Sequence, residues 1–163
     1  MSLVSCASQG EARVGNALSG DGTQSSGVVG TDHAKVGQIW WFAFPVVHNT
    51  SDNPISITGV SLRRVPKGIE VLKYGAYDRN DTEGLPLLAL EGDSAGPNFA
   101  KLKDYARRSV VVAGGTESDI FYVVKLRILA PPVQSARYCR FSYKQGGQTY
   151  TQEIDCEVHL KTD

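Results

Sequence analysis

The three cysteines are the residues of this sequence best suited to covalent chemistry. Cys139 and Cys156 lie in two stretches of alternating polar and apolar residues on either side of Gly146-Gly147. This pattern predicts a β-hairpin. With a loop at Gly147-Gln148, Cys139 lies directly opposite Cys156, so we expect a cross-strand disulfide. The alternative is two buried free thiols that pack as small hydrophobic residues.

A disulfide in this hairpin bears on where the protein works and on its stability. Disulfides persist in oxidising compartments, so we expect an extracytoplasmic location, either secreted or anchored at the cell membrane. In the chain-entropy model, closing a loop of this size stabilises the fold by roughly 3 kcal/mol.

Cys6 ends the segment Leu3-Val4-Ser5-Cys6, which resembles the lipobox of bacterial lipoproteins. The resemblance implies lipidation of Cys6 and membrane contact only through that lipid. The segment in front departs from the pattern, because five residues precede Cys6 and none is basic. A signal peptide has a basic start and an apolar stretch of about 7–15 residues. Either the natural chain begins further upstream or the match is a coincidence.

Other groups that could support catalysis or bind metal lack the spacing that such sites use. The three histidines form no H-x-H or H-E-x-x-H pattern. His48 and Asp52 flank one turn and could form a ligand pair, but a solvated turn histidine is the simpler interpretation. Ser109, Ser118 and Ser142 lie in no recognisable nucleophile context. We therefore expect no metal, no cofactor and no enzymatic activity.

The densest aromatic cluster is the best candidate for a partner surface. It consists of Trp40, Trp41, Phe42 and Phe44. In a strand, alternation sends Trp41 to one face and the other three residues to the opposite face. One face must be core, and the other would form an interaction patch if it were exposed. The alternative, which we favour, has both sets buried, with one set under residues 91–109.

Four basic residues, Lys101, Lys103, Arg107 and Arg108, could contact an anionic polymer or lipid headgroups, or simply form a solvated helix face. The chain as a whole has 17 basic and 17 acidic residues, so its formal net charge is zero. This balance excludes a nucleic-acid binder held mainly by phosphate contacts, which carries a positive surplus.

These groups must be positioned by two regions of different composition. Residues 1–37 are rich in glycine and serine and contain no aromatic residue, so we expect a flexible tether, in which Val28 and Val29 could still add a short edge strand. Residues 38–163 contain seven or eight short strand patterns with turn signals between them, which predict an all-β antiparallel sandwich. Pro45 should interrupt a strand, a slip in alternation at Gly59 predicts a β-bulge, and residues 98–108 fit one short helix.

Three segments carry a family resemblance. They are VVHNTSDNPISITGVSL (46–62), ESDIFYVVKLRIL (117–129) and YCRFSYKQGGQTYTQEIDCEVHL (138–160). Together they resemble the immunoglobulin-like β-sandwich domains of secreted proteins and lipoproteins of Gram-positive bacteria, especially actinobacteria. The cysteines lie only a hairpin apart and both tryptophans precede them, unlike the arrangement in antibody domains.

The resemblance is to a fold and does not bring a function with it. From all of these features we expect a non-enzymatic module of the cell envelope or the secreted space, which binds or supports an unknown protein or envelope component. The loops at 45–54 and 91–108 are the surfaces that we would test. The alternative is a small-ligand or metal-binding module of cupredoxin-like shape.

Overall fold

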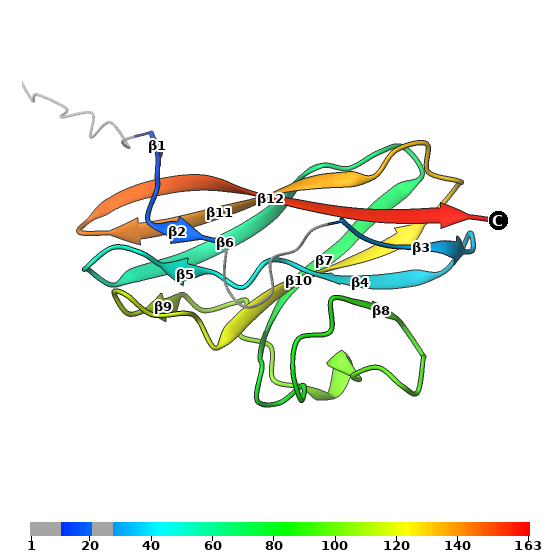
Figure 1. Ribbon diagram of the computed structural model, residues 1–163, viewed down its shortest axis with the longest axis horizontal. Helices are drawn as coiled ribbons and strands as arrows, with labels where there is room; N and C mark the ends of the chain where they lie inside the picture. The colour runs from blue at the N-terminus through cyan, green and yellow to red at the C-terminus, as the bar shows by residue number, and fades with distance from the viewer. Residues whose placement is uncertain (1–10, 21–27) are drawn as a thin grey trace, which may run out of the picture.

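The computed structural model describes residues 11–20 and 28–163, so Cys6 and its lipobox lie outside the described residues. The described chain forms two packed β-sheets and a short two-stranded sheet of β2 and β5 (Figure 1). Its elements are β1 (Arg13–Val14), β2 (Leu18–Ser19), β3 (Val28–Ala34), β4 (Ile39–Ala43), β5 (His48–Asn49), β6 (Ile55–Arg64), β7 (Ile69–Asp78), β8 (Leu88–Leu90), the 3₁₀ helix η1 (Phe99–Lys101), β9 (Val110–Val112), β10 (Ile120–Ile128), β11 (Ala136–Gln145) and β12 (Gln148–Thr162).

The two sheets have simple strand orders. The larger sheet runs β1-β12-β11-β6-β9, with β3 also beside β12, and the smaller sheet runs β7-β10-β4-β8. The chain crosses between these two sheets several times, for example between β6 and β7 and between β10 and β11. Neighbouring strands are antiparallel except that β1 and β3 lie parallel to β12. The predicted all-β sandwich is therefore confirmed.

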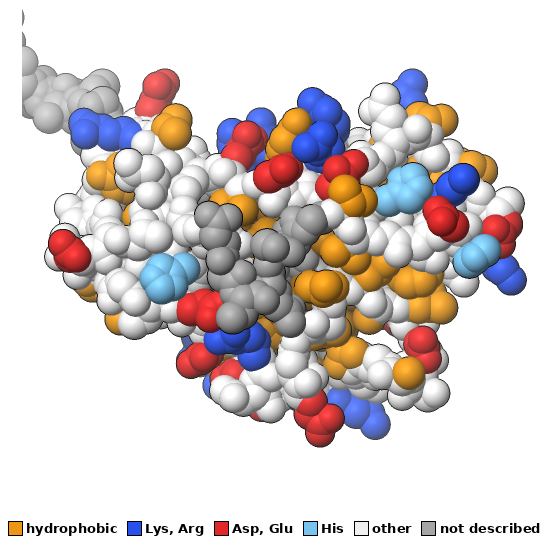
Figure 2. Space-filling model, viewed as in Figure 1, with side chains coloured by type: hydrophobic (Ala, Val, Ile, Leu, Met, Phe, Trp, Pro, Cys, Tyr) orange, Lys and Arg blue, Asp and Glu red, His pale blue; other side chains and the backbone are white. Residues whose placement is uncertain are grey.

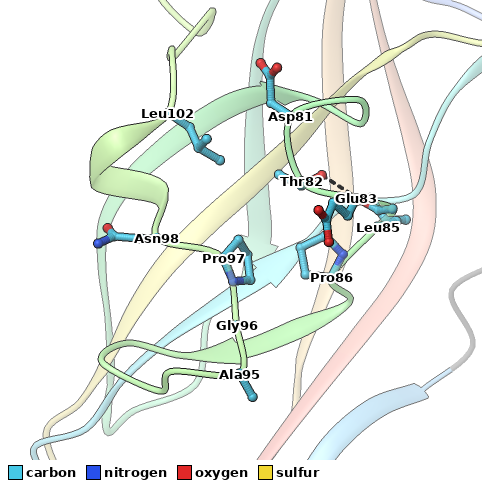
Figure 3. A pocket seen from close by; sticks show the side chains of 11 residues that line it. Asp81, Thr82, Glu83, Leu85, Pro86, Ala95, Gly96, Pro97, Asn98 and Leu102 are labelled. Carbon is cyan, nitrogen blue, oxygen red and sulfur yellow. Dashed lines mark hydrogen bonds between the residues drawn. The ribbon is translucent and has the colours of Figure 1, made fainter.

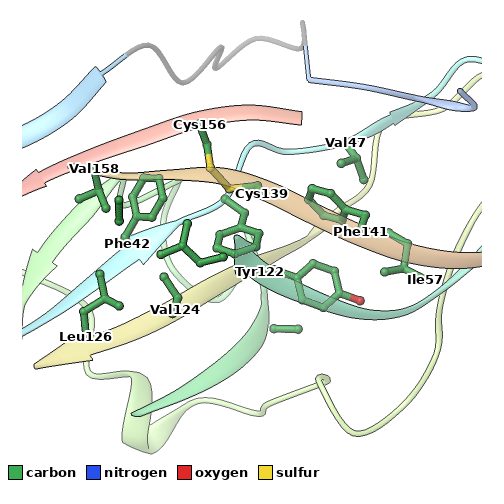
Figure 4. Packing of buried hydrophobic residues seen from close by; sticks show 14 of the residues in the cluster. Phe42, Val47, Ile57, Tyr122, Val124, Leu126, Cys139, Phe141, Cys156 and Val158 are labelled. Atoms are coloured by element: carbon green, nitrogen blue, oxygen red, sulfur yellow. A yellow bond between two sulfur atoms is a disulfide. The ribbon is translucent and has the colours of Figure 1, made fainter. Parts of the chain in front are cut away.

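The main hydrophobic core lies between the sheets and has an aromatic centre (Figure 4). Phe141 packs edge-on against Phe44 and Tyr122, with ring centroids 5.9 and 6.1 Å apart. Alternation along β10 sends Val124 and Leu126 into this core and Phe121 to the opposite face of the smaller sheet. The core is thus built from the period-2 pattern read in the sequence.

The closing hairpin contains the expected disulfide between Cys139 and Cys156, with a Cα–Cα distance of 5.8 Å. The predicted register is wrong: Cys139 lies opposite Ile154, because the turn is Gly146-Gly147. Both glycines have positive φ, 57° and 80°, which two-residue hairpin turns of this kind require. Moving the turn by one residue shifts the pairing by two, so the cysteines still face the core.

The prediction of a flexible tether up to residue 37 is wrong for the described part of that segment. β1 and β3 pair with β12, and β2 pairs with β5. Leu18 and Ala34 are buried. β12 is 15 residues long, and its free backbone edge offers hydrogen bonds that a glycine-rich chain can satisfy without large side chains.

The predicted helix at 98–108 is also wrong beyond the single turn of η1. Leu102 is already extended, with ψ 152°. The Tyr105 amide donates to the carbonyl of Ala76, and the Ala76 amide donates to Asp104 Oδ1 at 3.0 Å. The segment therefore hydrogen-bonds to the edge of β7, which holds it out of a helix.

Two smaller predictions are confirmed. β4 ends at Ala43, just before Pro45, and the chain resumes as a strand only at His48. The pairing of β11 with β6 shifts between Gly59 and Ile57, which is the bulge expected from the slip in alternation.

Candidate functional site

The most distinctive part of the structure is the segment between β7 and β9, residues 79–109, which we call the insertion. It leaves the sandwich after β7, adds β8 to the edge of the smaller sheet, and forms the lower lobe in Figure 1. β8 pairs with β4 through Trp40, Trp41 and Phe42. The insertion is therefore joined to the scaffold by backbone pairing as well as by side chains.

Trp41 fixes the insertion to the outer face of the smaller sheet. Its ring packs on Phe99 of η1 at 4.7 Å between centroids and on Tyr77 at 6.5 Å. The Nζ atoms of Lys125 and Lys73 lie over the same ring at 5.2 and 5.9 Å. These contacts form a second hydrophobic core, separate from the core between the sheets.

Burial in this second core changes the chemistry of Tyr77. Desolvation, together with the nearby negative charge of Asp104, raises the pKa of Tyr77 to about 12. Its phenol therefore stays neutral across the physiological range.

The aromatic residues proposed as a partner surface are mostly buried, which corrects that hypothesis. Phe42 and Phe44 are fully buried between the sheets, and Trp41 lies under the insertion. The favoured alternative therefore holds for these three residues. Trp40 alone of the four is partly exposed, and its Nε1 donates to Gln38 Oε1 at 3.2 Å.

Three adjoining hollows surround the insertion. The largest two are each about 470 Å³, and the third is about 350 Å³. Figure 3 shows the first, between the 81–86 loop and residues 95–98, where the Thr82 hydroxyl donates to the Gly84 carbonyl. Gly96 and Pro97 line all three hollows, so this dipeptide forms the wall between them.

The hollows are acidic. Asp81, Glu83 and Asp93 line them, and none of the three forms an ion pair with any residue that the structure describes. Glu91 is different, because it is bound to Lys125 at 3.0 Å. These three exposed carboxylates are therefore not neutralised by an ion pair within the described structure.

An apolar surface adjoins the acidic one. Figure 2 shows hydrophobic side chains gathered over β4 and β8. Trp40, Leu88 and Leu90 are partly exposed there and line the third hollow. The sequence offered Trp40 only as one member of the aromatic cluster, for which we favoured burial, whereas Leu88 and Leu90 are placed beside it by the pairing of β8 with β4.

One motif escaped the sequence reasoning. Gly92-Asp93-Ser94-Ala95-Gly96 matches the G-x-S-x-G pattern of hydrolase nucleophiles. Its context is wrong for that role, because the motif forms turns after a short edge strand and does not lead from a strand into a helix. No histidine is among the described residues that line the hollow next to Ser94.

The four basic residues proposed as an anion contact are all exposed, but they do not share a helix face. Lys103 lies over the ring of Tyr105 at 4.7 Å, and Arg107 lines a separate pocket beside β6 and β7. In the described ranges, 11–20 and 28–163, no group of three or more His, Cys, Asp or Glu side chains is placed to hold a metal ion.

Comparisons with known proteins assign the chain to no family. No protein-family model matches the chain, and no curated protein matches its sequence. Among solved structures, the Vibrio cholerae VesB protease is similar over 84% of this chain, at 14% identity and a TM-score of 0.39. The chain spans about a third of the length of that protein, of which the match covers 31%. A likeness this weak carries no argument about activity.

Proposed function

We propose that this protein is a non-catalytic binding module of the cell envelope or the secreted space, and that the insertion is its contact element. The observation that carries the proposal is the anchoring of the insertion through Trp41 and Phe99, whose rings lie 4.7 Å apart. Binding residues are commonly found on loops that a rigid scaffold holds in place. Here the scaffold holds an acidic surface next to an apolar one.

The scaffold is proposed to be immunoglobulin-like. One sheet contains the neighbours β7-β10-β4 and the other β12-β11-β6. In chain order these follow the D-E-B and G-F-C neighbours of the immunoglobulin constant-type fold. The parallel strand β3 beside β12 is an additional edge strand.

The disulfide indicates an oxidising, extracytoplasmic environment. In the described part of the chain, no helix is long and apolar enough to cross a membrane. We propose that Cys6 carries a lipid anchor. The intact mass of the protein isolated from its native cells tests this: a chain that begins at Cys6 and carries diacylglycerol supports the anchor, and an unlipidated Cys6 refutes it.

The proposed partner is a protein with a positively charged contact surface. Charge complementarity supports this choice, because Asp81, Glu83 and Asp93 line the hollows and form no ion pair with any described residue. The partly exposed Trp40 and Leu88 supply apolar area beside them. Aromatic residues next to charged rims are typical of binding hot spots.

Site-specific photo-crosslinking in the producing cells tests the contact element. A benzophenone amino acid is placed at Leu87 or Asn98 in the insertion, and, as controls, at the exposed positions Lys67 and Lys144 on other surfaces. We expect a discrete protein adduct from the insertion positions only. Equal adducts from all four positions, or none from the insertion, would contradict the proposal.

Charge reversal provides the second arm of the test. The double variant Asp81→Lys/Glu83→Lys should weaken the adduct at least tenfold. The matched control Glu11→Lys/Asp52→Lys changes the net charge equally, at exposed residues without ion pairs in the described structure. A loss of crosslinking in both variants would show a general charge effect and would count against the insertion as the contact element.

A further inference from the structure

A fourth pocket lies beside β6 and β7, at the opposite edge of the smaller sheet from β8. Its volume is about 450 Å³, within the range of small-molecule sites. Gly59 and Val60 of β6 form one wall, and Tyr74 of β7 forms another. Arg107, near the end of the insertion, also lines the pocket. It shares no residue with the three hollows of the insertion.

Tyr122 supplies a polar group to this pocket. The residue is 4% exposed, its hydroxyl has no hydrogen-bond partner among the described residues, and the hydroxyl is not one of the fully buried unpartnered atoms, so it remains accessible from the pocket. Figure 4 shows the hydroxyl at the end of the ring that points away from the disulfide. Tyr74 and Tyr143 differ, because their hydroxyls bond to the Leu62 amide and to Gln152. A hydroxyl that has no partner in the protein and is accessible from the pocket can donate a hydrogen bond to a ligand there.

The Tyr122 hydroxyl can act only as a neutral donor or acceptor at physiological pH. Burial raises the pKa of Tyr122 above its ordinary value of 10.0. The group therefore keeps its proton and can donate it in a hydrogen bond to an acceptor in the pocket.

The backbone of β7 offers a second donor. The amide and carbonyl of Ala76 point away from β10, since they bond to Asp104 and Tyr105. In an antiparallel pair this direction recurs at every second residue. The amide of Tyr74 is therefore directed at the same free edge, on the wall of the pocket.

The charges around the pocket leave one cation uncompensated. Asp104 Oδ2 is neutralised by Lys73 Nζ at 3.4 Å. Arg107 is exposed and forms no ion pair with any residue in the described ranges. One free guanidinium and two neutral donors form a set of groups that complements an anion.

We propose that this pocket binds a small organic monoanion, a carboxylate with a compact apolar body. Arg107 pairs with the carboxylate, and the Tyr122 hydroxyl donates a hydrogen bond to an oxygen of the ligand. Val60, Ala106 and the ring of Tyr74 contact the apolar body. This inference goes beyond the proposed function, because it concerns a different site and a different class of ligand.

The test uses benzoate as the probe, with benzamide as its uncharged counterpart. Benzoate is titrated into the full chain, labelled with ¹⁵N, and binding is followed through backbone amide shifts. We expect saturable binding, with shifts confined to the residues around Gly59, Tyr74 and Ala106, and benzamide binding at least tenfold more weakly. No saturation at millimolar benzoate, or shifts spread over other surfaces, would overturn the proposal.

Three variants locate the interaction. Tyr122→Phe and Arg107→Gln should each weaken benzoate binding about tenfold or more. The matched controls Tyr150→Phe and Arg108→Gln, which lie outside the pocket, should leave the affinity unchanged. Gly59→Leu adds bulk to the β6 wall of the pocket and should weaken binding; a Cβ at residue 59 meets no atom within 4 Å.

The folding of each variant is checked by its amide spectrum without ligand. Unchanged affinity in Tyr122→Phe and in folded Gly59→Leu would refute the site even if benzoate bound elsewhere. Crosslinking at the insertion does not depend on this pocket, so the two proposals can fail separately.

Discussion

Cys139 is bonded to Cys156 although the residue directly opposite it in the hairpin is Ile154. The bond runs diagonally, to the next core-facing position of β12. Both cysteines are buried, and they close the core at one end of the aromatic cluster (Figure 4). The disulfide therefore links the two strands of the hairpin, β11 and β12, and also forms part of the core.

Reducing this disulfide should lower the free energy of unfolding by about 3 kcal/mol, because the reduced unfolded chain gains loop entropy. Urea unfolding of the wild type with and without reductant measures the difference. Cys6→Ser serves as the control, since it removes the third thiol and should leave the difference unchanged. A change below about 0.5 kcal/mol would contradict a structural role for the bond.

Removing the ring of Phe99 should release the insertion from the scaffold. Phe99 is 4% exposed and packs on both Trp41 and Tyr77. Phe99→Ala should lower the stability by about 3–5 kcal/mol if the insertion and sandwich unfold together. If they separate, limited proteolysis should instead cut within residues 91–98 while the sandwich survives.

The control for that experiment is Leu87→Ala, which truncates a hydrophobic residue of the same insertion that is 37% exposed. It should change stability and cleavage little. Equal protection from protease in Phe99→Ala and wild type would show that the insertion is held mainly by its pairing through β8.

Asn49 organises the turn that follows β5. Its Nδ2 donates to the carbonyls of Asn53 and Val112, and its Oδ1 accepts from Ser51, all in a fully buried position. Asn49→Ala should lower the free energy of unfolding by about 1–3 kcal/mol, because buried partners lose their hydrogen bonds. Asn80→Ala, in an exposed turn, should cost under about 0.5 kcal/mol. Equal effects on thermal unfolding would contradict this role.

Much of the sandwich could be predicted because its signals are local. The alternation in β10 and the glycine turn of the last hairpin depend on neighbouring residues alone. The disulfide was predictable for the same reason, since a register error of two residues leaves Cys139 and Cys156 on the same face.

The candidate sites depend on long-range contacts, which local patterns do not encode. The spacing of Phe99 and Leu102 resembles a helix, yet the segment is extended because Asp104 and Tyr105 bond to the edge of β7. The burial of the Tyr122 ring follows from the pattern, but the accessibility of its hydroxyl from the pocket does not. Val28 and Val29 gave a weak strand signal, but the pairing of the whole of β3 with β12 depends on a free strand edge far away in the sequence, which the local residues do not specify.

Asp104 should make part of the stability depend on pH. Burial alone would raise the pKa of its carboxyl, but hydrogen bonds from the amides of Ala106 and Ala76 and the nearby Lys73 outweigh this and place the pKa below the ordinary 3.8. The folded state thus binds this proton more weakly than the unfolded state does. The stabilisation is present above about pH 4 and is lost as the pH falls through the lowered pKa.

Asp104→Asn keeps an oxygen acceptor for the two amides and removes the charge that faces Lys73. The variant should be less stable than wild type at pH 7 by about 0.2–1 kcal/mol, since the pair is partly exposed and screened by solvent. The difference should shrink as the pH falls below 3.8 and through the lowered pKa of the wild-type carboxyl, which then also loses its charge. Asp81→Asn, without an ion pair in the described structure, should match wild type throughout this pH range. A deficit for Asp104→Asn that persists unchanged down to the lowest pH at which both proteins fold would show that the loss comes from altered hydrogen bonds and not from the charge.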